Sequence, residues 1–230
     1  MAVALSRLHA ADPVASLTVF AGSLTMAAFA ALLAGSAFVI SWRTGIRGAG
    51  QAAVACALSF ALLGYPAFLT IVAFGLPPIH EVSTDLSSPP TFLLSAKARM
   101  ARAGHTPPQM TEETQAALRP AYPDLQTAVV PLDSTGAYQL ALAVAVDLGW
   151  RIVDSEPPNL SGEGGALIEA TDRSLFFGFV DDIAIRITPG ATQTAIDVRS
   201  VSRVGRHDFG ANARRVRKFL AAVREEIRER

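Results

Sequence analysis

Residues 181–217, DDIAIRITPGATQTAIDVRSVSRVGRHDFGANARRVR, decide the fold of the C-terminal part of this chain. Within them Ile183, Ile185 and Ile187 alternate with small or polar residues, a period of two that predicts a half-buried β-strand. The segment 189–192, PGAT, is typical of a turn and reverses the chain into a second strand. The stretch therefore predicts an antiparallel hairpin.

The position of the turn sets the register of this hairpin. A four-residue loop at 189–192 places Ile185 opposite Ile196 on the core face. On the other face Asp182 then meets Arg199, which is a favourable cross-strand pair of opposite charges.

The rest of the C-terminal region alternates between strand and helix patterns. The helix at 134–148 is apolar on nearly all sides and begins after Asp133 or at Ser134, either of which can cap it. The last helix has one apolar stripe and a charged outer face, typical of a helix that covers one side of a sheet. An antiparallel sheet covered by helices, an α+β domain, is therefore predicted. Further strands are expected at 127–131, 150–154, 166–172 and 175–180, and further helices at 96–103, 111–118 and 211–228.

Two long apolar runs precede this domain. Residues 14–40 and 51–76 contain no Asp, Glu, Lys, Arg or His, and each exceeds the roughly 20 residues that cross a bilayer core. A cleaved signal peptide is the alternative for the first run, but that run is about twice as long as a signal-peptide core. Small residues four apart, Ala27 and Ala31 in the first run and Ala53 and Ala57 in the second, favour packing as a hairpin.

These patterns divide the chain into four parts and suggest a topology. We expect an N-terminal tail at 1–12, two transmembrane helices at 13–76, an extended linker at 77–92 and the α+β domain at 93–230. The connector between the helices carries Arg43 and Arg47 and no acid, which favours a cytoplasmic connector and a periplasmic C-terminal domain in the inner membrane.

Charge is distributed unevenly although its sum is zero. Residues 199–218 hold seven bases and one acid, Asp208, while the rest of the chain after residue 77 holds ten bases and eighteen acids. Nucleic acid is not expected as a partner, because Phe209 is the only aromatic residue among these bases and this part of the chain is expected outside the cytoplasm.

Metal and cofactor binding are not expected. The four histidines, His9, His80, His105 and His207, lie far apart in the sequence, and the single cysteine, Cys56, lies within an apolar run. This gives no metal-ligand spacing and no disulfide framework.

Three motifs carry a resemblance to a known family. They are STD…PPTF in residues 83–92, GFVDDIAIRI in 178–187 and VRSVSRVGRHDFGANARRVR in 198–217. The region from about residue 80 to 225 resembles the domain of unknown function 1499 (DUF1499), a family of bacterial and plastid-related proteins that has no assigned activity. The resemblance implies a domain boundary but no reaction. Its motifs mark Asp181, Asp182, Arg199, Ser200, Ser202, Arg203, Gly205, Asp208, Gly210, Asn212 and Arg215.

The marked residues allow a structural and a functional interpretation. In the structural one, Asp181, Asp182 and Asp208 form charge pairs and a helix cap that fix the hairpin to the last helix. In the functional one, bases at the start of that helix bind an anionic ligand such as a phosphate, a carboxylate or a lipid head group. The predicted anion-binding residues are Arg199, Ser200, Ser202, Arg203, Asn212 and Arg215.

Catalysis is the alternative function. Asp182 and Asp208 could act as acid and base in a hydrolase of an envelope lipid or glycan, and Ser202, His207 and Asp208 have the residue types of a triad. Nearness in sequence is no evidence of that geometry, so no catalytic residue is assigned. We expect a membrane-anchored envelope protein, not an enzyme, whose domain binds an anionic ligand, an anionic lipid or a membrane-protein partner at the bilayer.

Overall fold

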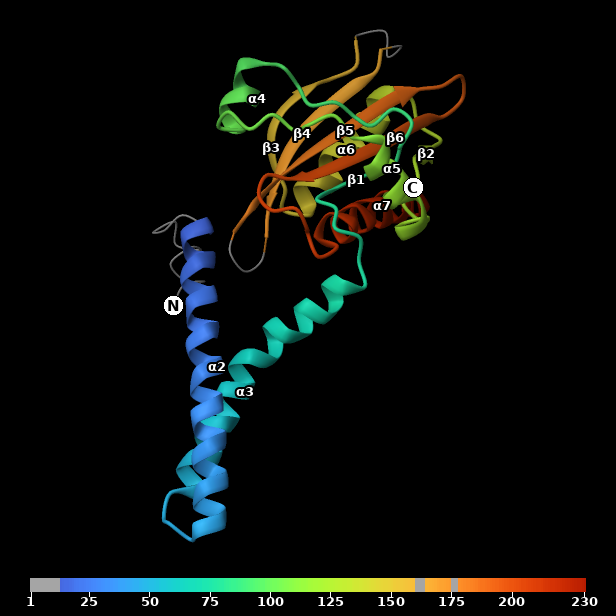
Figure 1. Ribbon diagram of the computed structural model, residues 1–230. Coiled ribbons are helices and arrows are strands. Elements are labelled where there is room, and N and C mark those ends of the chain that lie inside the picture. The colour runs from blue at the N-terminus through green and yellow to red at the C-terminus, as the bar shows by residue number, and fades with distance from the viewer. Residues whose placement is uncertain (1–12, 160–163, 175–177) are drawn as a thin grey trace. The chain divides into compact units, whose positions relative to one another are not determined.

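The computed structural model describes residues 13–159, 164–174 and 178–230 (Figure 1). The predicted tail at 1–12 lies outside the described residues. One compact unit contains two long helices, and a second begins at Leu76 and contains the sheet and the shorter helices. A helical hairpin followed by an α+β domain, the predicted fold class, is confirmed.

Helices α2 (Pro13–Thr44) and α3 (Ala49–Phe74) are long and apolar enough to span a membrane. Their candidate spans cover 30 and 23 residues, and only 11% and 6% of the most apolar window of each is buried. The core helix of a soluble domain would be mostly buried. Because these apolar side chains are exposed instead, apolar surroundings such as a bilayer would stabilise them.

The contact between α2 and α3 uses small residues, but in α3 they are not the predicted ones. Ala27 and Ala34 of α2 and Ala52 and Ser59 of α3 are buried, seven residues apart in each helix, whereas Ala53 and Ala57 are exposed. Small residues are so frequent in α3 that several helical stripes have the required spacing. Spacing therefore predicted a close helix pair without identifying the stripe in contact.

The second unit is built on one antiparallel six-stranded sheet in the order β1-β6-β5-β4-β3, with β2 also paired to β6 (Figure 1). Both β1 and β2 pair with β6, at its two ends. The strands are β1 (Glu81–Ser83), β2 (Ala128–Val130), β3 (Arg151–Glu156), β4 (Ala166–Arg173), β5 (Val180–Pro189) and β6 (Thr194–Ser202).

Four helices complete this unit: α4 (Ala96–Ala101), α5 (Glu112–Ala121), α6 (Ser134–Asp147) and α7 (Ala211–Glu229). The predicted cap of α6 is confirmed, because a side-chain oxygen of Asp133 accepts a hydrogen bond from the Gly136 amide at 2.8 Å. Phe219 of α7 is fully buried and stacks on Trp150, with ring centroids 5.3 Å apart.

The two faces of the sheet are covered differently. The helix face is covered by α6 and α7 and carries the main core, which includes Ile183, Ile185 and Val198. The loop face is covered by the segment 92–108, which contains α4 (Figure 1). Because this segment also excludes water, β5 is buried on both faces, and the prediction of a half-buried strand was wrong.

The predicted register of the β5–β6 hairpin was wrong by two residues. Ile185 lies opposite Val198, and Ala184, not Asp182, lies opposite Arg199. Strand β5 continues to Pro189, which pairs with Thr194 of β6, so the four-residue loop runs from Gly190 to Gln193. The Gly190 amide donates to the Gln193 carbonyl at 2.8 Å. A shift of two keeps every side chain on its predicted face, because strand side chains alternate with a period of two.

Two other segments differ from the sequence-based boundaries. Within the expected strand at 175–180, residues 175–177 lie outside the described residues, Gly178 and Phe179 are not in a strand, and β5 begins at Val180. Within the predicted linker at 77–92, residues 81–83 form strand β1 and are buried in the sheet. The chain thus enters the domain soon after α3 ends.

Candidate functional site

Arg215 of α7 is the centre of a buried polar cluster on the helix face. Its Nη2 donates to Asp181 Oδ2 at 2.6 Å, and its Nε donates to Asp172 Oδ2 at 2.7 Å. Arg215 and Asp181 are 7% and 4% exposed, whereas the Asp172 side chain is 31% exposed. The charge of one arginine is therefore shared by two carboxylates, one enclosed and one at the edge of the cluster.

Asn212 connects the same cluster to β6. Its Nδ2 donates to Ser202 Oγ at 2.9 Å and to the His80 carbonyl at 3.0 Å, and its Oδ1 accepts from Ser200 Oγ at 2.7 Å and from Arg215 Nη1 at 2.7 Å. Every polar atom of this fully buried amide therefore has a partner, as a buried polar network requires. We call Asp172, Asp181, Ser200, Ser202, Asn212 and Arg215 the helix-side cluster.

The electrostatics of this cluster favour mutual neutralisation. Burial raises the pKa of Asp181, and this effect exceeds the lowering by Arg215 and Ser202. The short contact to an always-charged guanidinium nevertheless makes an ion pair the natural state of this carboxyl near neutral pH.

The loop face carries a separate set of buried ion pairs. Arg199 Nη2 donates to Glu81 Oε2 at 2.6 Å, and Arg203 Nη2 donates to Asp182 Oδ1 at 2.6 Å. Asp182, which is fully buried, also contacts His105 Nδ1 at 3.2 Å. We call these contacts, together with Arg102–Glu169, the loop-side pairs.

Burial also affects Glu169, the third carboxylate of the loop-side pairs. Desolvation raises the pKa of Glu169, while Arg102 and the Leu93 amide act in the opposite direction. Arg102 also donates to the Leu93 carbonyl at 2.8 Å. The pair therefore fastens the segment before α4 to β4.

The structure separates the residues predicted to bind an anion. Arg199 and Arg203 lie on the loop face in different ion pairs, whereas Arg215, Asn212, Ser200 and Ser202 lie on the helix face. The predicted pair of Asp182 with Arg199 does not form, because the two-residue register shift places Ala184 opposite Arg199. The partner of Arg199 is Glu81, 118 residues away in the sequence. No local spacing could have indicated that contact.

Asp208 has a capping role, two residues earlier than a standard N-cap. The N-cap of α7 is Gly210, in a left-handed conformation, and Asp208 accepts hydrogen bonds from the amides of Gly210 and Asn212, both at 2.8 Å. Asp182 and Asp208 thus have different partners: the partly buried Arg203 and the start of α7. His207 Nδ1 accepts from the Phe209 amide at 2.9 Å, and Ser202 Oγ accepts from Asn212.

An exposed basic surface lies at the junction of β6 and α7. Four of the seven bases in 199–218 are paired with acids from elsewhere: Arg199, Arg203, Arg215 and Arg217, the last with Asp124. The remaining three, Arg206, Arg214 and Lys218, are exposed and have no ion pair within the described part of the chain. Exposed Val204 and Phe209 lie in the same segment. We call these five residues the β6–α7 surface.

The sequence indicated an excess of bases but not which of them were free. That distinction depends on acids 21 to 118 residues away that neutralise the other four, as the contacts of Arg203 with Asp182 and of Arg199 with Glu81 show.

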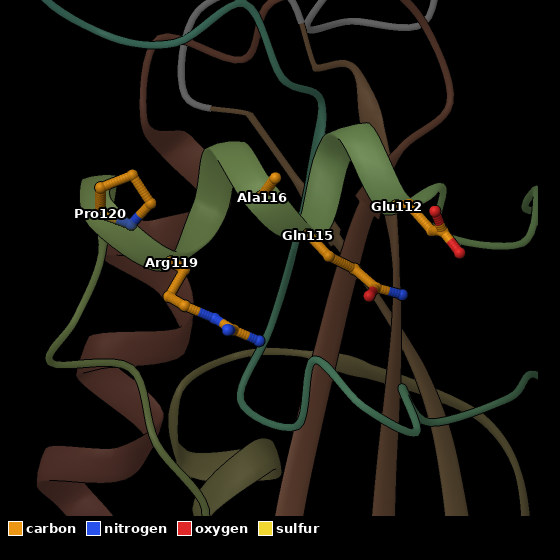
Figure 2. Close-up of a pocket in the computed structure, with 5 residues that line it drawn as sticks. All are labelled: Glu112, Gln115, Ala116, Arg119 and Pro120. Carbon is orange, nitrogen blue, oxygen red and sulfur yellow. The ribbon is translucent and has the colours of Figure 1, made fainter.

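A shallow hollow of about 480 Å³ lies along α5. It is lined by Glu112, Gln115, Ala116, Arg119 and Pro120, and Figure 2 shows Gln115 and Arg119 projecting from the same side of the helix. All five residues belong to one helix, so no groups from other elements converge on it. Among the residues that the structure describes, no group of three His, Cys, Asp or Glu side chains is placed to hold a metal ion.

Comparison with known proteins identifies the family. The model of the family described as "Protein of unknown function (DUF1499)" matches residues 81–223. The match begins at the first residue of β1 and ends within α7, so it covers nearly the whole of the α+β unit and neither apolar helix. The comparison with curated proteins returned no match. The chain belongs to the DUF1499 family, whose function is unknown.

Proposed function

We propose that this chain is a two-pass protein of the cytoplasmic membrane whose periplasmic α+β domain is a non-catalytic module that binds an anionic ligand. The anchor is supported by α2 and α3, which are apolar, long enough to cross a bilayer and mostly exposed. The orientation is supported by Arg43 and Arg47 in and beside the connector between them, since basic residues are enriched in cytoplasmic connections.

The binding role rests on one observation, the three bases of the β6–α7 surface that have no ion pair within residues 13–159, 164–174 and 178–230. The structure neutralises four neighbouring arginines with acids and leaves Arg206, Arg214 and Lys218 exposed. Exposed bases that are not neutralised by neighbouring acids attract anions and speed their association.

The proposed anion site lies at other residues than the sequence favoured. Arg199 and Arg215 are 4% and 7% exposed and hold buried carboxylates, so a ligand would first have to open those pairs. Removing a partner from a buried pair costs about 3–5 kcal/mol. The exposed bases require no such opening.

The anchor and its orientation are tested with fusions of a phosphatase that is active only in the periplasm. A fusion after Arg230 should be active, a fusion after Gly45 should be inactive, and the chain should resist extraction from membranes at alkaline pH. Activity only at Gly45 would overturn the orientation, and extraction into the soluble fraction would overturn the anchor.

The binding half is tested on the detergent-solubilised full chain with heparin as a soluble polyanion. The variant R206E/R214E/K218E should lose most of the binding. The matched control R99E/R119E/R151E reverses three other exposed arginines, on α4, α5 and β3, and should retain it. Equal loss in both variants, or no binding by the unaltered chain, would refute a localised anion site.

A further inference from the structure

We infer that the anionic ligand of the β6–α7 surface is the head-group layer of the bilayer that α3 enters. This inference rests on the proposed function, since it requires an anchored chain and exposed bases, and it names the ligand. In it, Arg206, Arg214 and Lys218 contact anionic lipid head groups, and Val204 and Phe209 enter the interface between head groups and acyl chains.

The covalent chain keeps this surface near the membrane. The candidate span in α3 ends at Ile71, and five residues later Leu76 already belongs to the domain. The Leu76 side chain lies against Gly210 at the start of α7. It is so close that a Cβ added to this glycine would lie 3.3 Å from Leu76 Cδ1. The next residues continue the contact, because the Asp208 amide donates to the Ile79 carbonyl at 3.1 Å.

The length of this tether is short. An extended chain spans at most about 3.5 Å per residue, so the five steps from Ile71 to Leu76 cover no more than roughly 18 Å. Since α3 continues to Phe74, where the rise per residue is only about 1.5 Å, the real span is nearer 12 Å. That distance is comparable with the interfacial region of a bilayer, so the β6–α7 surface remains within reach of the head groups.

The apolar residues of the surface suit an interface. Val204 and Phe209 are 46% and 41% exposed. Phe209 also has a φ of 53°, a left-handed conformation that is uncommon for a bulky residue. Because the fold holds a strained aromatic residue at the surface, this position is a candidate for contact with a ligand. Aromatic rings are enriched at membrane interfaces, which makes the bilayer a suitable ligand.

One of these bases contacts the residue that carries the aromatic ring. Arg214 Nη1 donates to the Phe209 carbonyl at 2.9 Å, and Lys218 follows four residues later on the same side of α7. The carboxylate within the loop, Asp208, accepts hydrogen bonds from backbone amides and so caps the helix. An aromatic ring together with three bases, none paired with an acid in the part of the chain that the structure describes, suits an anionic membrane surface.

The expected effect can be estimated from the charges. One base near an anionic bilayer changes the association constant roughly five-fold, so the loss of three bases should lower it by about two orders of magnitude. The effect should also weaken at high salt, because the Debye length falls from about 10 Å at 0.1 M to about 3 Å at 1 M. In a tethered domain both changes appear as a smaller docked fraction.

The test uses the full-length protein in proteoliposomes, with Cys56→Ala as background. A polarity-sensitive fluorophore is attached at Val204→Cys on the surface, or at Val146→Cys on α6, which is 54% exposed, as the matched control. The vesicles contain phosphatidylcholine alone or mixed with phosphatidylglycerol, and quenching by spin-labelled lipids reports contact with the bilayer.

We expect quenching at Val204→Cys to be at least five-fold stronger with phosphatidylglycerol, to be lost in R206E/R214E/K218E and to be retained in R99E/R119E/R151E. Quenching at Val146→Cys should stay low throughout. Equal quenching in both lipids, or none at Val204→Cys in a chain that resists alkaline extraction, would overturn the inference. If such a chain still binds heparin, the proposed function stands and only the lipid ligand is wrong.

Discussion

Replacement of Arg215 by methionine tests whether the helix-side cluster stabilises the domain. Methionine keeps most of the length and apolar volume of the side chain but removes its charge and all five N–H donors. Asp181, at 4% exposure, then loses the one ion-pair partner that it has among the described residues, and Asn212 Oδ1 and Ser200 Oγ each lose a donor. The variant thus leaves a buried carboxylate uncompensated.

The magnitude follows from burial. Breaking a buried pair by removing one partner costs about 3–5 kcal/mol, whereas breaking an exposed pair costs about 0–1 kcal/mol. The exposed pair Arg217–Asp124, with side chains 42% and 51% exposed, provides the control from the same helix. We therefore expect Arg215→Met to lower the free energy of unfolding by about 3–5 kcal/mol, and Arg217→Met by less than about 1 kcal/mol.

The assay is urea unfolding of the full chain in detergent, followed by the fluorescence of Trp150 in a Trp42→Phe background. Trp150 is buried and stacks on Phe219 of α7, so its emission reports the packing of this helix. The double variant Arg215→Met with Asp181→Asn should recover part of the loss, because the uncompensated charge is removed. Equal small losses for Arg215→Met and Arg217→Met would refute the reasoning.

The same variant has a predicted pH dependence. Burial raises the pKa of Asp181, and loss of Arg215 removes the main opposing effect. A carboxyl whose folded-state pKa lies above its unfolded value contributes stability below the unfolded pKa, about 3.9, and loses that contribution as the pH rises through the folded value. The destabilisation by Arg215→Met should therefore be smaller at pH 4 than at pH 8.

Three further predictions concern the domain outside this cluster. Gly210→Ala should destabilise the domain by about 1 kcal/mol more than Gly104→Ala. Both glycines have positive φ, but a Cβ at Gly210 would lie 3.3 Å from the Leu76 side chain, whereas a Cβ at Gly104 would meet nothing within 4 Å. Urea unfolding measures the difference. Asp208→Ala should lose about 0.5–2 kcal/mol with the capping hydrogen bonds, and Asp208→Asn less, in the same assay. Burial raises the pKa of Asp85, but the Ser88 amide and Arg186 lower it more, so that the pKa of this carboxyl is lowered overall. Its contribution to stability is therefore present above about pH 3.9 and is lost as the pH falls through the folded pKa. Asp85→Asn should flatten the acid limb of a curve of stability against pH.

The two apolar helices and the identity of most elements were predictable from local patterns. The helix at 134–148 was predicted to within one residue at each end, and its cap was correct, because a capping side chain bonds amides only three residues away. The faces of β5 and β6 were also correct, since alternation is a local property. The register was not predictable, because a loop of the same length placed one residue later satisfies the same alternation.

The sequence by itself determined what depends on neighbours along the chain: the apolar runs, the strand alternation, the capping of α6 and the family. Only the tertiary structure decided which charges are paired. Arg199 meets Glu81 and Arg203 meets Asp182, across separations of 118 and 21 residues, and these pairs follow from strand order and from the segment that covers the loop face. The excess of bases in 199–218 therefore becomes three exposed bases that have no acid partner in the described part of the chain, while burial makes pairing obligatory for Arg199 and Arg215.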